Sequence, residues 1–437
     1  MGGKAILLVV IAFSLMFSIV NYNSSNTTTR AVENLSEYYS KTNLQNIAAS
    51  GANMAANIIF KDPTWTGSFE KLPFQGGFID INVTKFAVDK IKITSTGYLT
   101  GIFDSEIGED TSLVKIILEP SSFSKFGYYT NKWPTGGYLV TGDTIDGPFH
   151  TQGKLLTLGS PVFTGKVTTK GGLSAEGNKW GYGAADPEFL AGYESPVDVP
   201  FTLNITKIKD AGNYDGKVFQ DASGNALDVK LVFSDDGSDI GVVQYSTKLT
   251  GTTTWSTPVT AKLDTLAPNG VIWNSKGNLY LSGTVNGKYT VGTGKSGSTN
   301  GYVYLEDDIV YRESPLIPDP SNPGYTITNH DCKDMLGVVA EKQVVVKDNT
   351  ANRSNINIHA SLFNYDGGIT VEGISASKPN MGTMKILGGL IENEAQTTGY
   401  TNGAGYRQVI KFDKRFETTT PPYFPATETY EIVSWFE

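Results

Sequence analysis

The feature that most constrains this chain is an uncharged, apolar run close to its amino terminus. Residues 5–20 contain no Asp, Glu, Lys or Arg, and only Ser14 and Ser18 interrupt the apolar side chains. As a helix the run would extend about 24 Å, somewhat less than the roughly 30 Å hydrocarbon core of a bilayer. A secretory signal peptide and a membrane anchor both fit this length, and both imply that the chain meets a membrane.

The residues that follow favour an anchor that is retained. A signal peptide should end in a cleavage site of small residues, of the A-x-A type. Residues 17–22 read Phe-Ser-Ile-Val-Asn-Tyr and offer no such site. We therefore expect the mature protein to keep this helix. The predicted membrane or filament-core residues are Ala5, Ile6, Leu7, Leu8, Val9, Val10, Ile11, Ala12, Phe13, Leu15, Met16, Phe17, Ile19 and Val20.

Helical periodicity continues beyond the apolar run. Residues 21–29 are Asn, Tyr, Ser and Thr, most of whose side chains compete for backbone hydrogen bonds, so they favour an interruption of the helix. Apolar residues then recur at spacings of three and four from Val32 to Ile59. Asp62-Pro63 ends the pattern, because the residue before a proline avoids the α region. The sequence predicts a helical spine of roughly 55 residues, about 85 Å long if unbroken.

Small residues crowd the second part of this spine. Ala48, Gly51, Ala52 and Ala55 include small-xxx-small pairs, which allow close approach to another surface. Two surfaces remain open for this packing. One is the chain's own β domain, and the other is a second copy of the chain, with the upper apolar half buried among copies in a filament core.

These residues resemble a known family. Gly3-Lys4, the apolar helix, Tyr38-Tyr39 and residues 46–56 (Asn-Ile-Ala-Ala-Ser-Gly-Ala-Asn-Met-Ala-Ala) resemble the opening of PilX-type, type IV pilin-like proteins. The resemblance implies a helix that resides in the membrane before assembly and lies inside a filament afterwards. The chain departs from the usual prepilin pattern of a glycine before an apolar first residue and a glutamate at the fifth. Here Gly3 precedes Lys4, and no acid occurs before Glu33.

The rest of the chain reads as strands and turns. Strand-like alternation at residues 78–83 and 91–94 and the apolar run 113–118 predict a small sheet packed on the helix. Glycines then follow at positions 147, 153, 159, 165 and 171, each six residues from the last. Such spacing is typical of short strands stacked in a β-solenoid, and a meander of tight hairpins is the alternative.

The resemblance extends into this part. Residues 147–153 (Gly-Pro-Phe-His-Thr-Gln-Gly) are similar to the G-P-x-H-T-N-G segment of long PilX-like surface proteins. Residues 412–416, residues 421–425 and Ser434-Trp435 resemble their closing Y-D-x-R, P-P-x-F-P and S-W pieces. Together, the sequence predicts a mainly β protein with a long N-terminal α-helix, in which a pilin-like helical spine carries a β-solenoid-like body.

Four regions are expected along the chain. They are a hydrophobic to amphipathic helix over residues 1–62, a small β-rich domain packed on it over 63–135, a β-solenoid-like body over 136–200 and 263–437, and an inserted surface lobe over 201–262. The lobe is expected because this stretch is richer in Asp, Lys and Thr, and solenoid loops tolerate insertion.

Composition excludes several classes of function. A single cysteine, Cys332, cannot form an intramolecular disulfide framework or a cysteine-rich metal site. Three histidines, scattered in the sequence, do not suggest a metal cage. The net charge is −9 without a basic block, which argues against nucleic acid as a partner. We expect neither a metal nor a cofactor.

Candidate catalytic groups each have a simpler structural explanation. Asp235/Asp236 lies in a turn where aspartate is expected, and alternation along a strand would separate the side chains of Asp307 and Asp308. His150 is expected to bind a turn. The remaining candidates are residues 330–332 (His-Asp-Cys) for nucleophilic chemistry, residues 292–296 as a partial phosphate loop, residues 235–239 as a calcium loop, and Trp65, Trp133, Trp180, Trp255 and Tyr193 as sugar-stacking rings. No catalytic residue is assigned, and we do not expect an enzyme.

The favoured function is a structural subunit of an extracellular type IV pilus-like filament, assembled through its N-terminal helix. Its expected partners are copies of itself, the inner membrane before assembly and the pilus assembly machinery. It would be membrane-anchored first and displayed at the cell surface afterwards. Two alternatives remain: a minor pilin or adhesin that binds a surface or carbohydrate ligand, and a membrane-tethered β-helix enzyme acting on polysaccharide.

Overall fold

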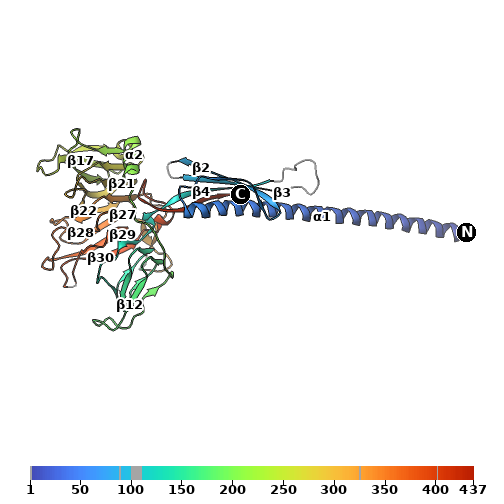
Figure 1. Ribbon diagram of the computed structural model, residues 1–437, viewed down its shortest axis with the longest axis horizontal. Coiled ribbons are helices and arrows are strands. Elements are labelled where there is room, and N and C mark those ends of the chain that lie inside the picture. The colour runs from blue at the N-terminus through green and yellow to red at the C-terminus, as the bar shows by residue number, and fades with distance from the viewer. Residues whose placement is uncertain (1, 88–89, 100–110, 324–325, 401) are drawn as a thin grey trace. The chain divides into compact units, whose positions relative to one another are not determined.

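The structure, a computed structural model, describes residues 2–87, 90–99, 111–323, 326–400 and 402–437. It is mainly β with a long N-terminal α-helix, as the sequence predicts (Figure 1). The chain divides into two compact units, one formed by Met1–Pro120 and Thr429–Glu437 and the other by Ser121–Glu428. The boundary after the first sheet therefore lies near residue 120, where the sequence suggested 135.

The helix α1 is continuous over Gly2–Lys61. The interruption expected at residues 21–29 does not occur, because the hydroxyls there bond to carbonyls of the helix itself. Thr27 Oγ1 donates to the Asn23 carbonyl at 2.8 Å and Thr28 Oγ1 to the Ser24 carbonyl at 2.9 Å. The helix ends as predicted, and the Asp62 carboxylate accepts a hydrogen bond from the Thr64 amide at 3.0 Å.

The first unit is a sheet with α1 on one face. Its strands are β1 (Ser68–Phe74), β2 (Gly77–Ala87), β3 (Lys90–Leu99), β4 (Thr111–Ser122) and β31 (Ala426–Phe436), in the order β1-β2-β3-β4-β31. The pairs β1–β2, β2–β3 and β3–β4 are antiparallel. Alternate residues, among them Ile79, Ile81, Ile93 and Ile116, point inward and pack on the helix. The small sheet on the helix thus forms, but it also recruits the last strand of the chain.

The second unit begins with strands that stack in parallel. One sheet contains β5 (Tyr128–Lys132), β8 (Phe149–Thr151), β11 (Val167–Thr169) and β14 (Tyr193–Glu194). A second contains β6 (Leu139–Val140), β9 (Leu155–Leu158) and β12 (Leu173–Glu176), and a third contains β7 (Thr144–Ile145), β10 (Val162–Phe163) and β13 (Glu188–Phe189). Phe149 pairs with Val167, 18 residues later, so one coil contains three of the six-residue glycine spacings. These pairs are parallel, unlike those of a hairpin meander.

Glycines stack where successive coils turn. A Cβ atom added to Gly165 would lie 2.2 Å from the carbonyl carbon of Gly147, one coil away. One added to Gly171 would lie 2.5 Å from the carbonyl carbon of Gly153. The coils therefore approach closely at these corners because neither glycine has a side chain.

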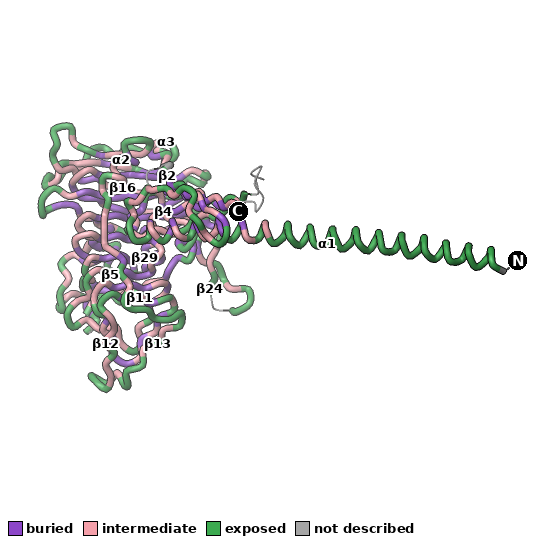
Figure 2. The backbone as a smooth tube through the Cα atoms, turned by 45° about the vertical axis from the view of Figure 1, so that its right-hand side comes forward, coloured by how far each residue is buried: buried purple, intermediate pink, exposed green. Residues whose placement is uncertain are grey.

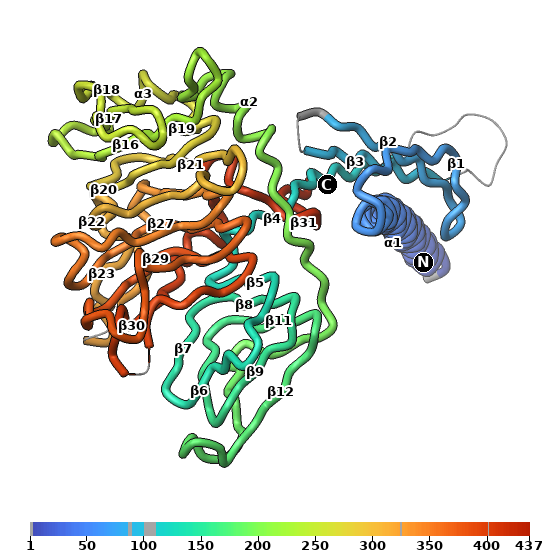
Figure 3. The backbone as a smooth tube through the Cα atoms, turned by 60° about the vertical axis from the view of Figure 1, so that its left-hand side comes forward, coloured from blue at the N-terminus to red at the C-terminus, as the bar shows by residue number. Residues whose placement is uncertain are grey.

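A longer series of parallel strands joins this stack. It contains β15 (Lys217–Phe219), β19 (Val271–Asn274), β21 (Lys288–Thr293), β25 (Met335–Ala340), β27 (Ile356–Asn364) and β29 (Asn380–Glu394), paired in that order. β29 in turn pairs with β5, where Leu390 faces Tyr128. The chain thus enters the middle of one continuous ladder and reaches one end at β14. It then returns to the other end through residues 195–204 and α2 (Ile205–Asp215) (Figure 3).

Residues 201–262 continue these ladders and do not form the separate lobe that composition suggested. β15 pairs with β19, and β16 (Leu227–Ser234) pairs in parallel with β20 (Leu279–Val285). The antiparallel β17 (Val242–Leu249) and β18 (Val259–Lys262) extend from β16. The remaining elements are α3 (Leu263–Leu266), β22 (Val303–Tyr311), β23 (Leu316–Pro318), β24 (Thr326–Thr328), β26 (Val344–Val346), β28 (Thr370–Val371), β30 (Gly405–Phe412) and the 3-10 turns Phe123–Lys125 and Lys414–Glu417.

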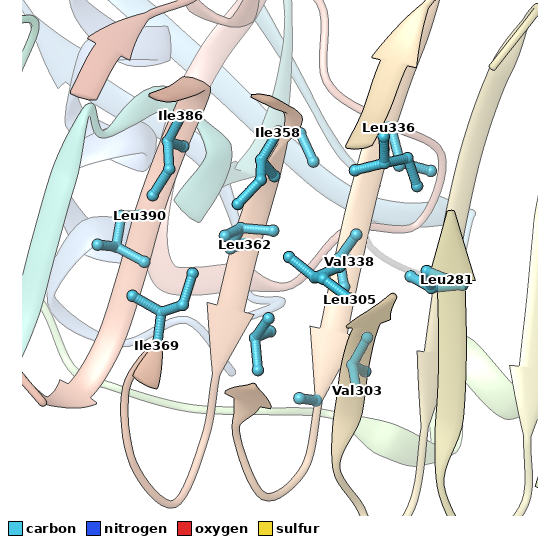
Figure 4. Packing of buried hydrophobic residues seen from close by; sticks show 14 of the residues in the cluster. Leu281, Val303, Leu305, Leu336, Val338, Ile358, Leu362, Ile369, Ile386 and Leu390 are labelled. Atoms are coloured by element: carbon cyan, nitrogen blue, oxygen red, sulfur yellow. The ribbon is translucent and has the colours of Figure 1, made fainter. Parts of the chain in front are cut away.

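The core of the second unit consists of apolar residues repeated from strand to strand. Leu281, Leu305, Val338 and Leu362 lie inside the stack, as Figure 4 shows. The other face of the ladder through β19, β25 and β27 is also covered, in part by Ile208 and Ala211 of α2 and by Val199 of the returning segment. Strands buried on both faces read as continuous apolar runs, which is why β25 has no alternation.

Candidate functional site

The most distinctive surface is the amino-terminal part of α1, residues 3–39, which we call the free half. Every residue in it is exposed (Figure 2). Leu8, Phe13 and Phe17 have exposed fractions of 68%, 67% and 71%. The helix is long and apolar enough to cross a membrane, and none of its most apolar stretch is buried. All the predicted membrane or filament-core residues lie in the free half.

The carboxyl-terminal part of α1, residues 44–59, is docked on its own sheet, and we call it the docked half. Ala48, Ala52 and Ala55 are fully buried there. A Cβ atom added to Gly51 would lie 2.4 Å from Ser95 Oγ. Of the two surfaces that the sequence left open for these four small residues, the structure places them against the β domain of the same chain.

The free half therefore lacks the cover that the docked half has. Burying one Val, Leu, Ile or Phe side chain contributes about 1.5–3 kcal/mol, and the run from residue 5 to 20 holds many of them. Apolar patches of this extent on a protein surface mark membrane or protein contacts. The arrangement suits lipid around the helix, or packing of the helix against other helices.

A second apolar patch follows in the free half. Val32, Leu35, Tyr38 and Tyr39 have exposed fractions of 61%, 69%, 70% and 72%. Val32, Leu35 and Tyr39 are spaced by three and four residues, so they share one face of the helix. The sequence shows this stripe, but periodicity alone cannot show that the chain's own sheet leaves it uncovered.

Charges are sparse along the free half. Lys41 Nζ lies 2.6 Å from Glu37 Oε1, an i,i+4 pair that holds the pKa of Glu37 below its usual value. Among the residues that the structure describes, Lys4, Arg30 and Glu33 of the free half have no ion partner within this chain. Lys4 borders the apolar run at its amino-terminal end.

The candidate acid pairs are occupied with backbone and side-chain hydrogen bonds. Asp308 accepts from the Asn357 amide at 2.7 Å and from Asn357 Nδ2 at 3.0 Å. Asp307 accepts from the Asp308 amide at 2.8 Å. Asp236 accepts from the Ser238 amide at 2.9 Å, as expected of a turn. These contacts explain the carboxylates structurally.

The loop considered for calcium holds a cationic side chain. Arg312 Nε lies 3.3 Å from Asp235, and Arg312 Nη1 lies 3.7 Å from Asp239. In the part of the chain that the structure describes, no group of three or more His, Cys, Asp or Glu residues is arranged to hold a metal ion. The guanidinium therefore neutralises these carboxylates.

The histidines and the cysteine lie apart from one another. His150 Nδ1 lies 2.7 Å from Thr168 Oγ1 on β11, so His150 binds a strand and not the expected turn. Burial lowers the pKa of His150 to about 4, and likewise that of His359. Burial raises the pKa of Cys332, which disfavours the thiolate, and His330 lies on an exposed loop.

The partial phosphate loop and the tryptophans also have internal partners. Lys295 Nζ binds the Asp366 carboxylate at 2.9 and 2.7 Å. The Trp255 ring contacts Tyr280 edge to face at 5.3 Å. Trp133 Nε1 donates to the Gly137 carbonyl at 2.7 Å, and Trp180, which is exposed, contacts Tyr138. The free half differs from these candidates, because no contact within the described part of the chain covers its apolar side chains.

Comparisons with known proteins add a distant similarity. No family model and no curated protein sequence matches the chain. Among solved structures, the chain is similar to the competence-associated pilin ComZ from Thermus thermophilus, over 91% of this chain and 97% of that chain. The identity is 11% and the TM-score is 0.33, a level at which nothing about the role of ComZ transfers to this chain.

Proposed function

We propose that this chain is a structural subunit of an extracellular type IV pilus-like filament, assembled through the free half of α1. One observation carries the proposal. The same helix is docked on its own sheet through one face over residues 44–59 and is exposed on all sides over residues 5–20, although the exposed part is the more apolar. A helix built this way requires a partner that its own chain does not provide.

Two partners meet this requirement at different times. Before assembly, the inner membrane covers residues 5–20 as an anchor. After assembly, the corresponding helices of other copies cover them. The contact is heterologous, which means that it joins two different surfaces of neighbouring copies. It therefore repeats without closing and produces a filament that displays the second unit at the cell surface. Movement from lipid to filament requires pilus assembly machinery, which is the remaining expected partner.

A single substitution tests the filament contact. Val10, exposed in the free half, becomes a buried charge in the assembled state when it is changed to lysine. We expect Val10→Lys to abolish filaments sheared from cells, because an unpaired charge in an apolar core is strongly unfavourable. The measurement is the amount of this chain in the sheared fraction and in the membrane fraction.

Thr28→Lys is the matched control, since it adds the same charge to the polar stretch of the same helix. It is expected to reduce filaments much less than Val10→Lys. Sheared filaments made chiefly of this chain would support a major subunit. Wild-type chain that never enters the sheared fraction, or Val10→Lys filaments as abundant as wild type, would contradict the proposal.

A further inference from the structure

If the free half is buried in a filament, the ammonium group of Lys4 at its amino-terminal end is buried as well. Lys4 directly precedes the apolar run, so packing residue 5 onward among other helices also removes Lys4 from water. A desolvated ammonium is costly unless an opposite charge meets it. No acid occurs among residues 1–32, and Glu33 is the first. A parallel copy without axial displacement therefore offers Lys4 no acidic side chain.

Glu33 is also the acid best placed to accept Lys4. Glu37 is already bound to Lys41 at 2.6 Å within its own helix. Glu33 has no ion partner among the described residues, and it lies on the fully exposed part of α1. Lys4 and Glu33 thus lie 29 positions apart on the same exposed helix. Arg30, three positions before Glu33, is a second cation there without an ion partner among the described residues.

Matching these two charges between parallel helices fixes a stagger. A shift of 29 residues corresponds to about 43 Å along the helix axis. At this shift, residues 5–20 of one copy lie beside residues 34–49 of the other. The second apolar patch, with Leu35, Tyr38 and Tyr39, falls within that range.

The second patch independently requires such a neighbour. Residues 5–20 account for the whole membrane anchor, and Val32 lies about 18 Å farther along the helix than residue 20. Lipid around the anchor cannot reach Leu35 or Tyr39, which the chain's own sheet also leaves exposed. The same 29-residue displacement therefore brings Lys4 beside Glu33 and the apolar run beside Leu35 and Tyr39.

We propose that Lys4 of one copy pairs with Glu33 of a second copy, in parallel and displaced by about 43 Å, so that the apolar run covers Leu35, Tyr38 and Tyr39 of the second patch. The inference rests on the proposed filament function and specifies its register. The occupant of the patch is a second copy of this chain.

Carbodiimide cross-linking of wild-type filaments tests the pair without any variant. This reagent joins an amine to a carboxylate in direct contact, and mass spectrometry identifies the joined peptides. We expect an intermolecular Lys4–Glu33 product, with the Lys41–Glu37 product reporting that the reagent reached the helices. Filaments that give Lys41–Glu37 but join Lys4 to another acid, or to none, would overturn the register and leave the filament function intact.

A charge exchange provides the second measurement. Lys4→Glu and Glu33→Lys are each expected to lower filament yield at least about tenfold, because each leaves like charges facing one another. The double variant is expected to restore most of the yield. Unchanged yield in the single variants, or a double variant no better than either, would refute the pair. Absence of wild-type filaments would instead refute the proposed function.

Discussion

At the scale of single residues, Gly51 shows how closely α1 lies on its sheet. A Cβ atom at this position would meet Ser95 Oγ at 2.4 Å and Ile79 Cγ2 at 2.5 Å. Gly51→Ala should therefore destabilise the docked half by about 1–3 kcal/mol from overpacking, partly offset by the better helix propensity of alanine. Hydrogen exchange of residues 44–59 should accelerate. Gly3→Ala, with nothing within 4 Å of the new atom, should leave this exchange unchanged.

Glu392 gives the second unit a pH-dependent stability. It is buried where β29 meets β5, accepts from Tyr128 Oη at 3.1 Å and from the Ile369 amide at 2.7 Å, and burial raises its pKa to about 8. The unfolded chain releases this proton near pH 4.5, so stability should fall as pH rises from about 4.5 to about 8.

Glu392→Gln should remove this part of the loss, which amounts to a few kcal/mol. Chemical unfolding of the wild type and the variant at pH 5 and pH 8 measures it. The exposed Glu394→Gln on the same strand is the control, and it should lose as much unfolding free energy between pH 5 and pH 8 as the wild type does. If Glu392→Gln loses as much unfolding free energy between these two pH values as the wild type, the Glu392 carboxyl group is not the cause of the pH dependence.

Residue patterns predicted some of these features and not others. Four small residues at helical spacing predicted a close contact, but periodicity defines which face is buried and not what buries it. The burial of Glu392 had no sequence signal, because its surroundings come from β5 and from residues 368–369, far apart in the chain.

At the scale of elements, the glycines at the turns allow successive coils to lie close together. Gly165→Ala would place a methyl group 2.2 Å from the backbone of Gly147, which cannot rotate away as a side chain can. We expect this variant to lose more than about 2 kcal/mol, since overpacking against backbone leaves no simple relaxation. Limited proteolysis should then cleave within residues 139–194.

Lys166→Ala is the control for this change, because it removes an exposed ion pair with Glu194 that contributes little. Its proteolysis pattern should match the wild type. Equal resistance of Gly165→Ala would mean that the coils separate more easily than their backbone spacing implies.

The sequence was informative about the coils but not about their order. Glycines six residues apart predicted stacked strands, and parallel strands with an 18-residue offset occur there. The pairing of β29 with β5 could not be predicted, because the segments are over 250 residues apart in the chain and their apolar residues would suit many neighbours. For the same reason residues 201–262 looked like a lobe, although their strands complete the ladder.

At the scale of the whole molecule, the strands pack against one another and against the docked half of α1, whereas nothing in the described part of the chain packs against the free half. The last strand, β31, belongs to the first unit, which the sequence did not reveal, since sheet pairing between the two ends of a chain has no local signal. The apolar run is different, because sixteen uncharged residues demand cover whatever the rest of the fold does.

Structure determination of filaments sheared from cells tests this claim most directly. The account predicts that residues 5–20 are present in the subunit, helical and buried among parallel copies along the filament axis. Filaments in which this segment is cleaved off or faces solvent, with the subunits joined only through their strands, would contradict it.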